Sequence, residues 1–178
     1  MTHLRYLIPA ALSALFALNL HADAIIPEVF LHQNVRVAGV VDRNADLDKS
    51  TVLGFEVGYA QAIHPIDQMV FSFGHISSSD LEQNYFLLSF EQHFKLNPQL
   101  APYGATGVGF IWNDDKRGND DRESLYGKVA GGLIFQAAER LAVYGEVSYL
   151  VATKGIWLDG PGFENTNFQA SIGIRYSF

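Results

Sequence analysis

The chain has 178 residues, the length of a single domain, and its high aromatic content (13%) with few charged residues (17%) argues against disorder. No cysteine is present, which excludes disulfide bonds, thiolate metal sites and cysteine nucleophiles. Lysine and arginine total 12 against 19 acidic residues, and the formal charge of −7 makes nucleic-acid binding a poor fit.

Residues 1–24 predict a cleavable signal peptide, followed by one domain over residues 25–178. Arg5 lies in a short polar start, residues 7–20 are almost wholly apolar, and Ala22-Asp23-Ala24 supplies a cleavage site of small residues. The alternative is an N-terminal membrane anchor, but the apolar run is shorter than the roughly 20 residues that a spanning helix needs. We therefore expect an exported protein.

The rest of the chain predicts β-strands, because apolar and polar residues alternate in one segment after another. The last segment shows this most clearly. Its apolar face carries Phe168, Ala170, Ile172, Ile174, Tyr176 and Phe178. Its other face carries Asn167, Gln169, Ser171, Gly173, Arg175 and Ser177. In chain order, the eight predicted segments cover residues 34–41, 53–60, 69–74, 85–94, 103–112, 125–135, 143–151 and 167–178.

The connections between these segments alternate in character. Tight turns are predicted at His64-Pro65, at Asn97-Pro98 and at residues 137–139. Polar loops, most of them longer, are predicted at residues 42–50, 77–82, 113–123 and 153–164. Short turns at one end and longer loops at the other are typical of an outer-membrane barrel, and an even number of strands places both termini at the short-turn end.

Two closed arrangements explain the alternation. With the apolar faces outward, the barrel suits lipid and closure satisfies every backbone hydrogen bond. With the apolar faces inward, it would be a soluble, lipocalin-like barrel. We favour the first, because the segments supply the roughly 9–11 residues that a membrane-spanning strand needs. The predicted fold is all-β, a closed eight-stranded antiparallel transmembrane up-and-down β-barrel. Its expected interfacial aromatic girdle consists of Tyr59, Phe94, Trp112, Tyr149 and Phe178.

The predicted inward faces carry three positive and three negative side chains. These are Arg36, Glu56, Glu91, Lys128, Glu146 and Arg175. Strand order predicts contacts of Arg36 with Glu56, of Lys128 with Glu146, and of Glu146 with Arg175. Because buried charges are costly unless they are paired, and because an eight-stranded barrel is just wide enough for side chains to fill, we expect an ion network that closes the interior. The alternative is a conducting porin.

The chain resembles the small eight-stranded outer-membrane barrels: the membrane domain of outer-membrane protein A, outer-membrane protein X and the opacity-type proteins. The resemblance rests on the Ala22-Asp23-Ala24 site, the eight alternating segments, the Pro102-Tyr103-Gly104-Ala105-Thr106-Gly107-Val108-Gly109-Phe110 strand and the terminal Arg175-Tyr176-Ser177-Phe178. It implies a location in the outer membrane and an assembly signal, read by the barrel-assembly machinery, at Ile172, Ile174, Tyr176 and Phe178. No peptidoglycan-binding domain follows Phe178, so we expect no cell-wall tether.

The expected function is a structural or surface-interaction role without enzymatic activity or a cofactor. The expected partners are outer-membrane lipid and lipopolysaccharide, with the barrel-assembly machinery during biogenesis, and we expect a monomer. The first alternative is an adhesin or opacity-type protein that binds ligands through its outer loops. The fold itself does not decide between these roles.

The third alternative is a hydrolase built on His75 and Ser77, which lie two residues apart on the outward face of one strand. A histidine can activate a serine when a third group orients it, and Asp80 or Glu82 could be that group. The pair is similar to the His-Ser pair of lipid A deacylase barrels. Those enzymes carry it on a late strand before Asn-Ala-Gly, whereas here it lies on the third strand before Ser78-Ser79-Asp80.

Two loops carry further patterns. Asp42, Asn44, Asp46 and Asp48 alternate in the first loop, as in a calcium loop, but Leu47 stands where glycine is expected. We interpret this loop and the charged loop at residues 113–123 as solvated surface, and the charged loop could share divalent ions with lipopolysaccharide. The last loop contains Trp157 and Phe163. These aromatics predict either a contact patch or a fold over the barrel mouth, and the sequence leaves both open.

Overall fold

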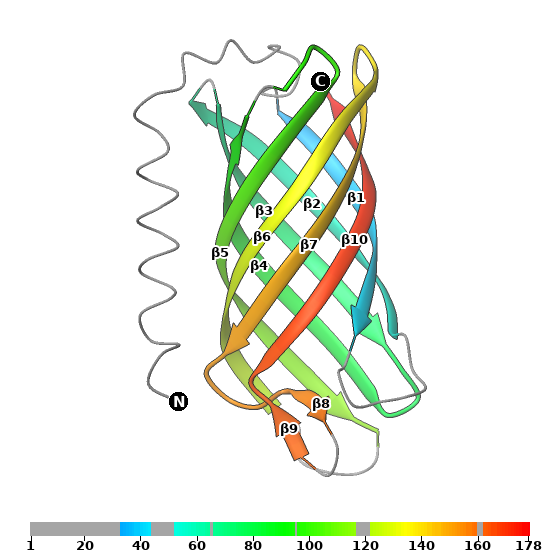
Figure 1. Cartoon of the computed structure of the whole chain (residues 1–178). Helices are drawn as coiled ribbons and strands as arrows, with labels where there is room; N and C mark the ends of the chain where they lie inside the picture. The colour runs from blue at the N-terminus through cyan, green and yellow to red at the C-terminus, as the bar shows by residue number, and fades with distance from the viewer. Residues whose placement is uncertain (1–32, 44–51, 65, 95, 117–121, 160–161) are drawn as a thin grey trace.

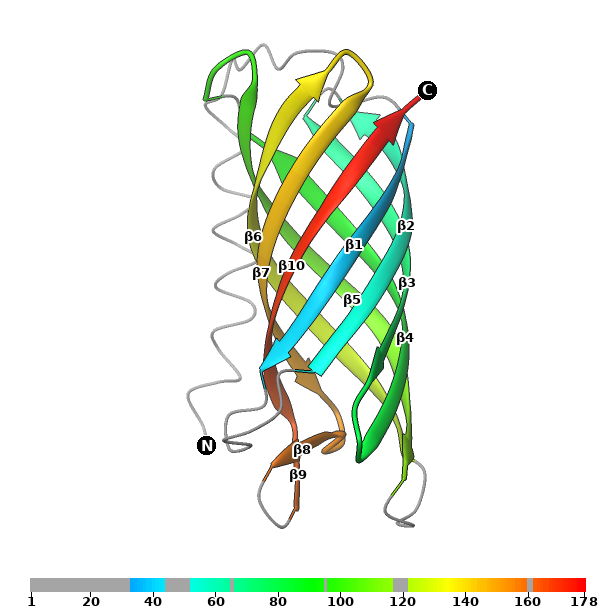
Figure 2. The same cartoon turned by 90° about the vertical axis from the view of Figure 1, so that its right-hand side faces the viewer.

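The computed structural model describes residues 33–43, 52–64, 66–94, 96–116, 122–159 and 162–178. Over these residues the chain forms a closed barrel of eight strands and a separate two-stranded hairpin (Figures 1 and 2). The barrel strands are β1 (Asn34–Arg43), β2 (Val52–His64), β3 (Asp67–Ser77), β4 (Leu81–His93), β5 (Leu100–Asp115), β6 (Arg122–Ala138), β7 (Leu141–Ala152) and β10 (Thr166–Ser177). The hairpin strands are β8 (Trp157–Asp159) and β9 (Gly162–Glu164). The predicted signal peptide lies outside the described residues.

All neighbouring strands of the barrel pair antiparallel, and β1 closes it against β10. The closing register runs from Asn34 opposite Ser177 to Arg43 opposite Phe168. The predicted fold, a closed eight-stranded antiparallel up-and-down barrel, is therefore confirmed. Among the described residues, no helix has the length and apolarity that a membrane crossing requires.

The two faces of every barrel strand differ in the way that the alternation predicts. On β10, for example, Ile172 and Ile174 are exposed on the outside, whereas Gln169 and Arg175 are buried inside. The other strands repeat this arrangement, with large apolar residues outside and many polar or charged residues buried within. The alternative of a soluble barrel with an apolar interior is therefore wrong.

Inside the barrel, four tyrosines each lie over a glycine directly opposite on the neighbouring strand. A Cβ placed on any of these glycines would lie less than 3.0 Å from the tyrosine ring. The absence of a side chain on one strand thus makes room for a ring from the next, which fills the lumen. The pairs are Tyr85 with Gly74, Tyr126 with Gly109, Tyr103 with Gly132 and Tyr144 with Gly173.

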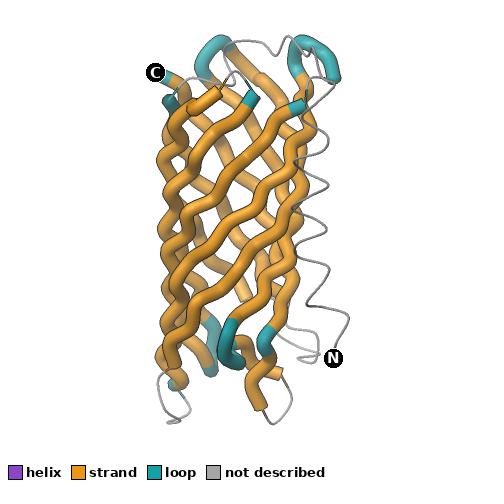
Figure 3. Tube along the Cα trace, turned by 90° about the vertical axis from the view of Figure 1, so that its left-hand side faces the viewer, coloured by secondary structure: helices purple, strands orange, loops and turns teal. Residues whose placement is uncertain are grey.

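The two ends of the barrel differ, as Figure 3 shows. The turn end carries Phe178, the connection between β2 and β3, in which Ile66 is a turn residue, and the β6–β7 turn at residues 139–140. The loop end carries the β3–β4 connection, the β5–β6 connection and the β8–β9 hairpin.

At the loop end the connections are more ordered than the sequence suggested. The predicted loop at residues 77–82 is a turn of residues 78–80, because the Ser78 hydroxyl accepts hydrogen bonds from the backbone amides of Asp80 (3.2 Å) and Leu81 (3.0 Å). The predicted loop at residues 113–123 is shortened, because β5 and β6 continue their ladder through Asn113 opposite Arg122. The predicted loop at residues 153–164 contains the β8–β9 hairpin.

Candidate functional site

The interior of the barrel is organised around Glu91 on β4, a carboxylate that is completely buried. Arg36 on β1 donates from Nη1 to Glu91 Oε1 at 2.5 Å, and Arg175 on β10 donates from Nη1 to Glu91 Oε2 at 2.9 Å. Both guanidinium groups are themselves almost fully buried. One carboxylate therefore joins strands from opposite walls of the barrel, and its charge offsets much of the cost of burying the two arginines.

The second arm of Arg36 extends this network toward β2 and β3. Its Nη2 donates to Glu56 Oε1 and to the Ser72 hydroxyl, each at 2.9 Å. The other oxygen of the Glu56 carboxylate accepts a hydrogen bond from the Tyr85 hydroxyl at 2.9 Å. The predicted contact between Arg36 and Glu56 is thus present, and both carboxylate oxygens have a partner.

A separate ion pair lies on the β6–β7 side of the interior. Lys128 Nζ is 2.5 Å from Glu146 Oε1, as strand order predicts, and the Tyr103 hydroxyl donates to Glu146 Oε2 at 2.9 Å. The three positive and three negative side chains of the predicted network are all buried.

The partner predicted for Arg175 was wrong. The sequence places it beside Glu146, but the register sets Arg175 opposite Ala142 and Glu146 opposite Ser171, four residues further along β7. Arg175 reaches across the lumen to Glu91 instead. Its guanidinium also lies 4.7 Å from the ring centroid of Tyr144, a distance at which cation–π attraction operates.

His93 also belongs to this network, which the predicted set of six charged residues does not include; it lies two residues after Glu91 on the same inward face. Its Nε2 is 3.4 Å from Glu91 Oε2, and its ring stacks on Tyr103 with 5.5 Å between centroids. The spacing of two could have identified it, since side chains at i and i+2 share a face of a strand.

The loop end of the interior is filled by the segment that precedes and begins the β8–β9 hairpin. Ile156 and Trp157 are only 0% and 1% exposed, and they pack with inward apolar residues of the barrel wall such as Ile111 and Leu150. Gln83 Nε2 donates to Asn113 Oδ1 at 2.9 Å, and Asn113 Nδ2 donates to the carbonyl of Ile156. The sequence left open whether the aromatics of this loop form a contact patch or fold over the barrel mouth. Trp157 folds over the mouth. The side chain of Phe163 is not described.

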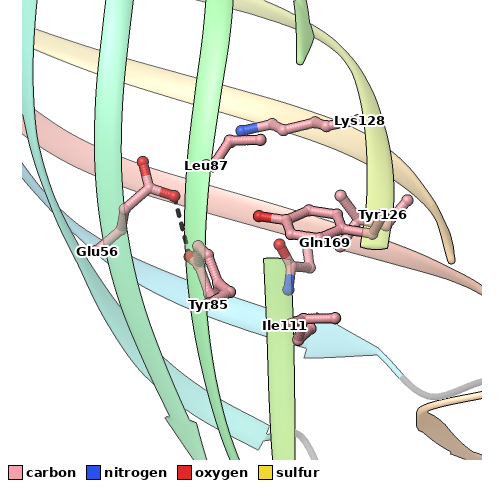
Figure 4. A pocket seen from close by; sticks show the side chains of 8 residues that line it. Glu56, Tyr85, Leu87, Ile111, Tyr126, Lys128 and Gln169 are labelled. Atoms are coloured by element: carbon pink, nitrogen blue, oxygen red, sulfur yellow. Dashed lines mark hydrogen bonds between the residues drawn. The ribbon is translucent and has the colours of Figure 1, made fainter. Parts of the chain in front are cut away.

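Two small cavities lie between these groups. One internal cavity, lined in part by Glu56, Tyr85 and Lys128, measures about 10 Å³ (Figure 4). A second, lined in part by Asn34 and Arg175 at the turn end, also measures about 10 Å³. Each is about the size of the space that one water molecule occupies.

The outward pair His75 and Ser77 does not form a catalytic arrangement among the described contacts. His75 Nδ1 lies 2.8 Å from the Asn84 side-chain oxygen, and its ring is tilted against Phe55. The Ser77 hydroxyl accepts a hydrogen bond from Lys116 Nζ at 3.1 Å. Glu82, a proposed orienting group, is 3.8 Å from that same ammonium group.

The calcium-like pattern of the first loop is described only at Asp42. This side chain is buried inside the barrel, where its carboxylate accepts hydrogen bonds from the side-chain amides of Asn167 and Gln169. Asn44, Asp46 and Asp48 lie outside the described residues. No cluster of three or more histidine, aspartate or glutamate residues suited to a metal ion occurs in the described part of the chain.

The residues of the predicted assembly signal form one exposed row on the outside of β10 and just beyond it. Ile172, Ile174, Tyr176 and Phe178 all face away from the lumen. The rings of Tyr176 and Phe178 meet edge to face at the turn end, with centroids 6.0 Å apart.

The sequence matches no protein-family model, and no curated protein matches it. Its structure, in contrast, is similar to several solved barrels. Neisserial surface protein A superimposes with a TM-score of 0.63 at 13% identity, over 83% of this chain and 96% of that one. The N-terminal β-barrel domain of Pseudomonas aeruginosa OprF gives 0.60 at 14% identity, over 82% of this chain and 97% of that one.

A de novo designed transmembrane β-barrel also matches, with a TM-score of 0.55 at 17% identity over 83% of this chain and 96% of that one. Since a designed barrel matches along with natural ones, the likeness concerns architecture and carries no activity with it. The chain therefore has the fold of the small eight-stranded outer-membrane β-barrels.

Proposed function

We propose that the protein is an integral outer-membrane β-barrel with a closed interior and a structural or surface-interaction role. The observation that carries this proposal is the set of side chains buried inside the barrel: a balanced set of ion pairs in the middle, tyrosines beside them and Trp157 at the loop end. Such an interior supports a closed barrel, because a transport function would need a continuous path for water.

The surface of the barrel supports a membrane location. Large apolar side chains such as Phe55, Val108 and Ile172 are exposed on the outside, where a soluble protein would bury them. By the usual arrangement of such barrels, the loop end faces the cell exterior and the turn end faces the periplasm.

The direct test measures conductance. Refolded protein that migrates as a compact, heat-modifiable species is reconstituted into planar bilayers beside a water-filled porin of larger strand number. We expect steady baseline current for this protein and clear steps for the porin. Reproducible unitary steps from pure, folded protein would overturn the closed interior.

Adhesion through the outer loops is the rival role, and the described loop end gives it little surface. The β3–β4 connection is a three-residue turn, and Ile156 and Trp157 are buried in the barrel mouth. Comparison of surface adhesion by intact cells with and without the protein separates the two roles: a loss of adhesion favours the rival.

We further propose that the outward row Ile172, Ile174, Tyr176 and Phe178 is read by the barrel-assembly machinery. Its support is position: the row follows the outside of the closing strand β10 to the turn end and is exposed over its whole length. A row that contributes little to the closed interior is free to serve recognition during folding.

A further inference from the structure

A groove crosses the outer surface of β5, β6 and β7 near the loop end of the barrel. Its volume is about 720 Å³, within the range of sites that bind small molecules. The walls consist mainly of outward apolar side chains: Val108, Phe110, Leu125, Val129, Tyr149 and Val151.

The floor of the groove is Gly127 on β6. The register sets Gly127 opposite Val108 on β5 and opposite Val151 on β7, while Leu125 and Val129 flank it on the same face of its own strand. A Cβ on Gly127 would meet nothing closer than the carbonyl oxygens of Gly107 at 3.9 Å and Val151 at 4.0 Å. The missing side chain therefore leaves a notch between projecting walls, of which Val108 is 67% exposed and Leu125 is 63% exposed.

The groove begins just inside the boundary of the apolar surface. Trp112 pairs with Glu123, and the next outward pair toward the turn end is Phe110 with Leu125. The outward face of β6 thus changes from charged to apolar in one step. A molecule in the groove would have its apolar part at the depth of acyl chains and its polar part at the loop end.

Hydroxyl and cationic residues follow the groove at its loop end. Thr153 lines it and shares a 2.9 Å hydrogen bond with the Ser124 hydroxyl. Lys154 follows directly and is exposed, and Arg122, also exposed, donates from Nη1 to the carbonyl of Gly155 at 3.4 Å. Lys154 and Arg122 are the cationic groups with which an anionic head group would pair here.

We propose that the groove binds an acyl chain of a phosphorylated glycolipid of the outer leaflet, the lipid anchor of lipopolysaccharide, with its phosphate at Lys154. A narrow apolar notch suits a linear chain of methylene groups, and the cationic residues at the loop end suit the phosphate. The inference rests on the proposed function, since it requires a barrel in the outer membrane with its loop end outward. It adds a defined site to the general lipid contact expected of any membrane barrel.

The test counts lipid molecules that remain bound to refolded protein in native mass spectrometry after incubation with purified lipid A. Gly127→Leu fills the notch, and Gly131→Leu places the same side chain further along β6, where a Cβ would meet nothing within 4 Å. We expect Gly127→Leu to lower the retention of lipid A about tenfold, because the loss of about two buried methylene contacts corresponds to that factor. Gly131→Leu should leave the retention of lipid A unchanged. Val108→Phe serves as a second notch-filling variant should Gly127→Leu fail to fold.

The head group is tested with Lys154→Gln, and with Lys116→Gln as the control at another exposed lysine of the loop end. Lys154→Gln should weaken retention of lipid A but not of its dephosphorylated form, and Lys116→Gln should change neither.

Equal retention by the Gly127 and Gly131 variants would overturn the site. A wild-type dimer that Gly127→Leu converts to monomer would overturn it too, because the groove would then hold a second copy of the chain. Failure of the wild type to form a compact, heat-modifiable barrel in lipid would instead contradict the proposed function.

Discussion

The ring of Tyr85 occupies the space that Gly74, directly opposite on β3, leaves empty: a Cβ on Gly74 would lie 2.0 Å from the ring carbon Cζ. The same ring donates its hydroxyl hydrogen bond to Glu56. The smallest residue on one strand therefore holds a tyrosine in the position from which it stabilises a buried carboxylate.

Gly74→Ala should for this reason destabilise the barrel, since the methyl group displaces the ring and strains or breaks the bond to Glu56. We expect the free energy of unfolding to fall by about 1–3 kcal/mol, the usual cost of overpacking. Gly131→Ala is the matched control, because its new Cβ meets no atom within 4 Å. Urea unfolding in lipid vesicles measures both; equal stability of the two variants would contradict the role assigned to the Tyr85–Gly74 pair.

The buried pair Lys128–Glu146 allows a test of charge balance. Lys128→Met alone leaves the carboxylate of Glu146 buried without its cation and should cost about 3–5 kcal/mol. Adding Glu146→Gln removes that charge and keeps an acceptor for the Tyr103 hydroxyl. The double variant should therefore be more stable than Lys128→Met, and unfolding measurements in which the two changes simply add would argue against direct coupling.

The two tryptophans of the chain report on opposite sides of the wall. Trp112 faces outward, with its ring 5.9 Å from that of Phe110, whereas Trp157 is buried in the barrel mouth. Brominated acyl chains should quench Trp112 fluorescence in the Trp157→Phe variant and leave Trp157 fluorescence in the Trp112→Phe variant nearly unchanged. Strong lipid quenching of Trp157 would mean that the loop end does not close over the lumen.

The strand pattern and the identity of the buried charges could be predicted because they depend only on local alternation. A period of two assigns each residue to a face, and the cost of an unpaired charge in lipid then selects the face for Arg36, Glu91 and Arg175. Within β10, the alternation holds from Asn167 to Ser177 without a break.

Contacts across the lumen could not be predicted in the same way. The partner of Arg175 was sought on an adjacent strand, but the side chain is long enough to reach Glu91 on the far wall, and only the closed geometry shows this. The burial of Trp157 is a contact between a loop and the barrel interior, which follows no periodic pattern. The tyrosine–glycine pairs are easier to predict from the sequence, because a strand register deduced from the turns places each tyrosine opposite its glycine.

The terminal row allows assembly in cells to be separated from stability. Phe178 and Phe168 are both aromatic residues on the outward side of the final strand or its end, 62% and 59% exposed, but Phe178 lies at the turn end and Phe168 at the loop end. Phe178→Ser should lower the amount of folded, heat-modifiable protein in outer-membrane fractions, whereas Phe168→Ser should lower it far less. Refolding into detergent without any assembly factor should proceed alike for both variants, because exposed positions contribute little to stability. If both variants lost the same amount of protein in cells, the loss would reflect removal of an outward aromatic ring in general, and the C-terminal row would have no special part in recognition.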